Sequence, residues 1–94
     1  MLRSMTTAKG AELRIMAEEE LASAVALKWA ELKRITPWGD TFEGFAPSGR
    51  TVEIERRYIW AQNPVGAVLV EVEVRDRSNR TGVEARALLA PPAF

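Results

Sequence analysis

The spacing of hydrophobic residues in the first third of the chain predicts one long amphipathic helix. Residues 11–35 are rich in Ala, Glu, Leu and Lys, which favour helices, and they include neither Gly nor Pro. Apolar residues recur there every three or four positions, which places them on one side of a helix. Pro37 disfavours helical backbone at the residue before it, so we expect the helix to run from about 7 to 35. The expected apolar stripe consists of Leu21, Val25, Trp29 and Leu32.

The second half of the chain alternates between apolar and charged residues, which predicts strands. Three such stretches cover about 51–61, 67–76 and 82–90. Alternation with one polar side is typical of an antiparallel sheet that is covered on one face, with Glu and Arg forming cross-strand ion pairs on the other. Residues 36–50 contain three glycines and two prolines between Pro37 and Gly49 and are therefore expected to be a loop.

These elements predict a fold of the α+β class in a single domain, residues 1–94. One long N-terminal amphipathic helix would pack on a small antiparallel sheet of about three strands. A chain of 94 residues is long enough for only one small core, so the packing of helix on sheet must supply most of the stability.

The composition excludes several classes of function. The chain has no Cys and no His, so it lacks a thiol and also the commonest neutral-pH base and metal ligand. Thirteen basic and thirteen acidic residues balance, so no surplus positive charge attracts nucleic acid. Asp40 and Glu43 are too few to surround a calcium ion. We therefore expect no enzyme activity, no catalytic residues, no cofactor, no metal and no nucleic-acid partner.

Two apolar residues lie off the main stripe of the predicted helix. Met16 and Leu27 fall on the far side of the helical wheel. Single apolar residues on a surface are normal, so they need no special role. The alternative interpretation is a second helix face that packs against a neighbouring helix.

The order of these features resembles the type IV pilin-like proteins, and most closely the I-type minor pseudopilins of type II secretion systems. The resemblance covers about residues 11–92 and depends on the order and spacing of its elements. Those elements are the helical segment 17–32, the loop motif Pro37-Trp38-Gly39, the aromatic strand Tyr58-Ile59-Trp60, the strand Val70–Arg75 and the closing segment Leu88–Pro92.

The resemblance implies a mechanical function. A hydrophobic stem ahead of Met1 would anchor the protein in the inner membrane, with this head in the periplasm and no other membrane contact. The head would pack through its N-terminal helix against other minor pseudopilins at a filament tip, and it would meet secreted cargo there. Parallel packing of helices requires a ridge that the sheet leaves uncovered, and the candidates for this partner interface are Leu13, Met16, Glu20 and Leu27.

Two alternatives remain open from the sequence. A minor pilin of a type IV pilus would share the same head plan. A cytosolic α+β binding or regulatory module would instead begin at Met1 and use the helix to pair two copies.

Overall fold

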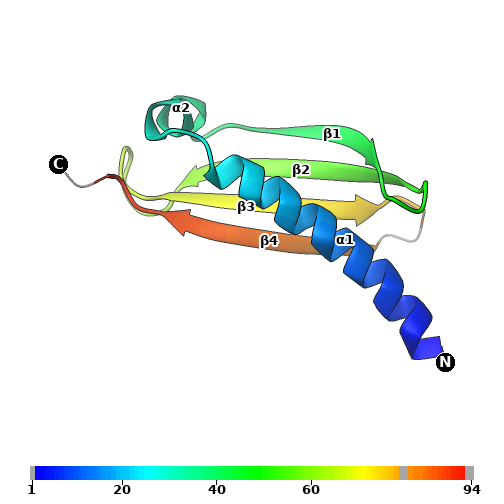
Figure 1. Cartoon of the computed structure of the whole chain (residues 1–94). Helices are drawn as coiled ribbons and strands as arrows, with labels where there is room; N and C mark the ends of the chain where they lie inside the picture. The colour runs from blue at the N-terminus through cyan, green and yellow to red at the C-terminus, as the bar shows by residue number, and fades with distance from the viewer. Residues whose placement is uncertain (1, 79–80, 93–94) are drawn as a thin grey trace.

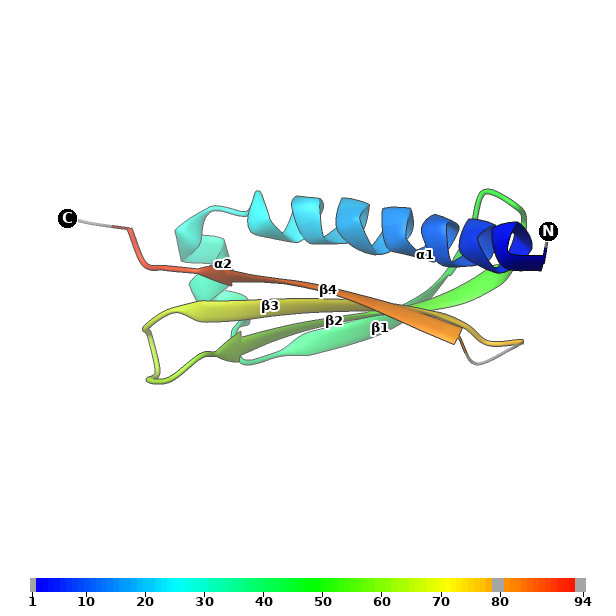
Figure 2. The same cartoon turned by 90° about the horizontal axis from the view of Figure 1, so that it is seen from below.

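The computed structural model describes residues 2–78 and 81–92 and shows two helices and four strands (Figure 1). The chain forms an antiparallel meander in which each strand pairs with the next, in the order β1-β2-β3-β4. α1 crosses one face of this sheet diagonally and packs on β3 and β4, while the opposite face is open (Figures 1 and 2). The elements are α1 (Leu2–Val25), α2 (Trp29–Ile35), β1 (Gly39–Phe45), β2 (Thr51–Trp60), β3 (Val68–Asp76) and β4 (Thr81–Leu89).

The predicted α+β class fits broadly, but the prediction of one long helix from 7 to 35 is wrong. α1 ends at Val25, and Lys28 has extended backbone (φ −66°, ψ 149°) before α2 begins. A straight continuation of α1 would bring Lys28 and Glu31 into line with its covered side, where charge is costly. The break changes the helical phase, so that Leu32 is buried instead. The covered side of α1 comprises Leu13, Ala17, Leu21 and Ala24.

The prediction of a three-stranded sheet is also wrong, because part of the expected loop 36–50 is the edge strand β1. Phe42 is the one large apolar side chain that β1 directs toward the helix side, where it packs on the core. Gly44 lies close to Ile54 on β2, and an added Cβ there would stand 3.2 Å from the Ile54 side chain. A strand with a single apolar anchor and glycines within it gives no clear alternation, which explains why the sequence pattern missed it.

The other three strands lie where the alternation predicts them, within one residue at each end. The stretches 51–61, 67–76 and 82–90 correspond to β2, β3 and β4. The core has one part beneath α1 and a second part beneath the junction of the two helices, around Tyr58 and Leu32. In the described part of the chain, no helix combines the length and apolar character needed to cross a membrane.

Candidate functional site

A groove lies at the junction of α1 and α2, and we call it the junction groove. It encloses about 310 Å³ and opens to solvent. The loop after α1, the end of α2, the start of β1 and the middle of β2 supply its walls. The groove is lined by Leu27, Ile35, Trp38, Gly39, Asp40, Arg56 and Tyr58.

The junction groove has an apolar rim and a fixed polar wall. Trp38 is 70% exposed and Leu27 is 36% exposed, so both present apolar surface to solvent. Tyr58 is buried in contrast, and burial raises the pKa of its phenol. Exposed tryptophan beside a concavity is typical of protein contact surfaces. The groove therefore has the chemistry of a binding surface.

Arg56 forms the polar wall, and its guanidinium is fully engaged. Its Nε donates to Asp40 Oδ1 at 2.9 Å, a second nitrogen contacts the other Asp40 oxygen, and Nη1 lies 3.2 Å from Glu20 Oε1. The guanidinium also stacks 5.0 Å from the centre of the Phe42 ring. The hydrogen bond from Arg56 lowers the pKa of Asp40, which keeps this carboxylate ionised. These paired charges fix Arg56 and Asp40 in the wall of the groove.

The four residues predicted to contact a partner occupy different environments. Leu13 is fully buried in the core, so its assignment to an uncovered ridge is wrong. Met16 is partly buried and packs against the same core cluster. Glu20 pairs with Arg56 at the edge of the groove, and Leu27 lines the groove. The structure thus brings Glu20 and Leu27 to one surface and separates both from Leu13.

None of the exposed residues on the outward side of α1 was predicted to contact a partner. Ile15 is 54% exposed, and Glu18, Glu19 and Ala22 are exposed beside it. These positions follow a spacing of three or four residues and therefore share one side of the helix. The spacing of residues in the sequence could have identified this side, because it lies opposite the apolar stripe that begins at Leu13. Of the expected stripe, Leu32 is buried and Leu21 and Trp29 pack against the core. On α1, however, that stripe ran through Val25 instead of Leu13 and Ala17, and it therefore concealed the outward side.

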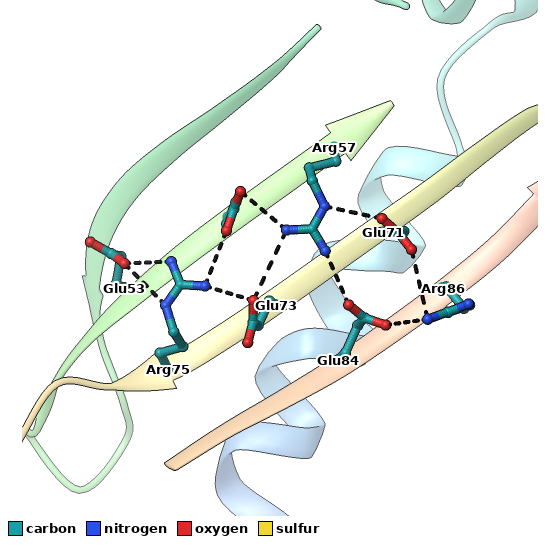
Figure 3. Close-up of polar contacts among 8 residues, drawn as sticks. Glu53, Arg57, Glu71, Glu73, Arg75, Glu84 and Arg86 are labelled. Carbon is teal, nitrogen blue, oxygen red and sulfur yellow. Dashed lines mark hydrogen bonds and ion pairs between the residues drawn. The ribbon is translucent and has the colours of Figure 1, made fainter. Parts of the chain in front are cut away.

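The open face of the sheet carries a continuous array of ion pairs, which confirms the expected cross-strand pairing (Figure 3). Arg57 Nε lies 3.0 Å from Glu71 Oε1, and its Nη2 lies 3.0 Å from Glu84 Oε2. Hydrogen bonds from Arg75 and Arg86 lower the pKa values of Glu55 and Glu84, respectively. Every glutamate of the array contacts an arginine. The array consists of Glu53, Glu55, Arg57, Glu71, Glu73, Arg75, Glu84 and Arg86.

A second polar cluster fastens α1 to the opposite end of the sheet. Arg50 Nη2 lies 2.6 Å from Glu12 Oε2 on α1, and Nη1 contacts Asp76 at the end of β3. The backbone N–H of Ser78 donates to Asp76 Oδ1 at 2.9 Å. Hydrogen bonds from Ser78 lower the pKa of Asp76, while the bond from Arg50 lowers the pKa of Glu12. These bonds satisfy a buried carboxylate and make the cluster structural.

Within residues 2–78 and 81–92, no group of three or more Asp and Glu side chains is arranged to hold a metal ion. Comparison of the chain with protein-family models, curated proteins and solved structures finds no match.

Proposed function

We propose that the chain is the head of a pilin-like filament subunit, of the kind found as I-type minor pseudopilins in type II secretion systems. It acts by packing against sister subunits and performs no catalysis. The resemblance over residues 11–92 motivates this proposal. The observation that carries it is the outward side of α1, which the sheet leaves uncovered and on which Ile15 is 54% exposed.

The outward side of α1 suits close approach by a neighbouring helix. Ala11 and Ala22 are small and exposed on it, and Ile15 provides an apolar contact between them. The open face of the sheet, in contrast, is occupied by paired charges, whose removal from water is costly. A partner is therefore expected on the helix side.

The direction of α1 is compatible with an anchored head. Its N-terminal turns pass beyond the edge of the sheet next to β4, away from the junction groove (Figure 1). A hydrophobic stem that continued α1 would therefore run clear of the head. In our proposal this stem lies in the inner membrane and the head lies in the periplasm.

Co-purification with sister subunits tests this proposal. The tagged chain would be co-expressed with the soluble heads of pilin-like proteins encoded by neighbouring genes. Ile15→Glu should lower recovery of the complex about tenfold or more, since it removes an apolar contact and adds a charge. Ile59→Glu, on the open face of the sheet, is the matched control and should leave recovery unchanged. Equal loss in both variants, or no complex with the unmodified chain, would contradict the proposal.

The gene sequence ahead of the Met1 codon provides an independent test. The proposal requires a short basic leader, a small residue and then about 20 mainly apolar residues. A ribosome-binding site directly before that codon would contradict it and favour a cytosolic dimeric module. Neighbouring genes of a pilus, in place of a secretion system, would reassign the subunit to a type IV pilus.

A further inference from the structure

The strand β4 forms one edge of the sheet and is regular along its whole length. It is last in the strand order, so in the described part of the chain only its β3 side has a neighbouring strand. Its nine residues pair with β3 in an unbroken register, and residues 81–89 contain neither Pro nor Lys. Figure 2 views the sheet from this edge and shows α1 above the sheet, not beside β4. A regular edge without a bulge, proline or lysine is a template for a further strand.

The hydrogen-bond pattern shows which backbone groups of β4 point away from the sheet. The N–H of Tyr58 donates to the C=O of Trp38 at 3.0 Å, so even-numbered residues of β2 point toward β1 and odd-numbered ones toward β3. When this alternation is followed through the next two registers, the odd-numbered residues of β4 bond to β3. The even-numbered residues, 82 to 88, therefore direct their N–H and C=O groups outward. A side chain of α1 agrees with this direction, because Arg14 Nη1 donates to the C=O of Glu84 at 3.2 Å.

The sequence of β4 is complementary to itself in one antiparallel register. Two copies of this edge keep their open-face residues opposite each other only when the two-fold axis passes beside a residue. An axis at Glu84 or at Arg86 would place two like charges directly opposite each other, which is destabilising. An axis at Ala85 instead places Glu84 of each copy opposite Arg86 of the other. Ala85 is also the midpoint of Thr81–Leu89, so this register pairs the whole strand.

The open-face side chains of β4 have room for these contacts. The Arg86 side chain is 61% exposed, against 30% for Arg57 and Arg75, and it lies at the outer margin of the ion-pair array (Figure 3). A carboxylate from a second copy can therefore reach it. Leu88 is also exposed, and the register places it opposite Gly82 of the other copy, where no side chain obstructs it.

We propose that two copies of the chain pair antiparallel along β4, in the register centred on Ala85, and so join their sheets into one. The two-fold axis is perpendicular to the sheet, so both α1 helices lie on the same face and run in opposite directions. Parallel stems in a filament would require parallel helices. The edge-paired dimer is therefore a state of free heads, and neither this dimer nor the proposed filament contact depends on the other.

Charge reversal tests the register with the whole chain. Arg86→Glu places Glu84 opposite a second glutamate, and Glu84→Arg places Arg86 opposite a second arginine. Each variant alone should therefore raise the dissociation constant of the dimer about tenfold or more. An equimolar mixture of the two variants should form a heterodimer at a concentration at which neither dimerises alone, because every opposed pair again has opposite charges. Sedimentation equilibrium measures the dissociation constants, and circular dichroism verifies that each variant is folded. Lys33→Glu, on the exposed side of α2, is the matched control and should leave dimerisation unchanged.

Amide hydrogen exchange provides a measurement that needs no substitution. In the unmodified chain, the amides of residues 82, 84, 86 and 88 should exchange more slowly as the protein concentration rises through the dissociation constant. The amides of Thr41 and Glu43, which point outward on the opposite edge of the sheet, should not change. Protection at β4 that does not vary with concentration, or a mixture of the two reversed variants that stays monomeric, would overturn the proposal. Co-purification with sister subunits is a separate measurement, so either result can fail without the other.

Discussion

At the scale of single residues, the position of a side chain on α1 decides whether it supports the fold or contacts a partner. Leu13 and Ile15 are two positions apart, yet the first is fully buried and the second is 54% exposed. The sheet covers only one side of the helix, so a rotation of about 100° per residue separates these roles. The two residues therefore provide a matched pair for testing where the core lies.

We predict that Leu13→Ala lowers the free energy of unfolding by about 2–5 kcal/mol, because it leaves a cavity between α1 and the sheet. Ile15→Ala should change it by less than about 0.5 kcal/mol, since the side chain is mainly in water. Urea denaturation followed by circular dichroism measures both. A small effect of Leu13→Ala on the free energy of unfolding would indicate that Leu13 is not a core residue and belongs to the partner surface.

The sequence identified the period of α1 but not its phase. Several positions in the helix are alanine, which fits a core or a surface equally well. The stripe that begins at Leu13 and the predicted stripe through Val25 and Trp29 are both compatible with a period near 3.6. Contact with the sheet selects the first stripe and forces the break before α2. Which stripe is buried depends on tertiary packing, so the spacing of apolar residues along the sequence does not reveal it.

At the scale of elements, β1 shows what local patterns cannot predict. The three strands with alternating valine and charge were located within a residue. β1 has one apolar anchor, and it is held as a strand by its ladder with β2 and by the pairing of Asp40 with Arg56. Of the residues that line the junction groove, only Leu27 was among the predicted partner-interface residues, and the groove itself was not predicted because its other walls come together only through β1.

Two glycine substitutions should have opposite effects on these elements. A Cβ at Gly39 would lie 2.3 Å from the backbone oxygen of Arg56, so Gly39→Ala should displace the start of β1 and destabilise the fold. Gly10→Ala, within α1, meets no neighbouring atom within 4 Å and should stabilise the protein by about 0.5–1 kcal/mol. Thermal unfolding compares the two variants. A neutral Gly39→Ala would show that β1 is not required in this register.

At the scale of the whole molecule, ion pairs connect elements in addition to the contacts of the small core. Arg50 links α1 to the end of β3, Arg56 links α1 to β1, and the array on the open face spans three strands. Each exposed pair contributes little by itself. Together, these ion pairs make the stability of the fold depend on whether the carboxylates are ionised.

Between about pH 3 and pH 8, stability should therefore depend on pH only at the acid end. The pKa values of Glu12, Asp40, Glu55, Asp76 and Glu84 are lowered in the folded chain, chiefly by hydrogen bonds from arginine and serine. The unfolded chain then binds more protons as the pH falls through the ordinary values near 4, so the stability from these groups is complete above that range and is lost below it. With no histidine in the chain, the melting temperature should stay level from about pH 8 to 5 and then fall toward pH 3. Asp40→Asn should lower the melting temperature at pH 7 but narrow its difference between pH 7 and 3, because one titrating carboxylate is gone. A decline between pH 8 and 5, or a level curve down to pH 3, would show that these pairs do not support the fold.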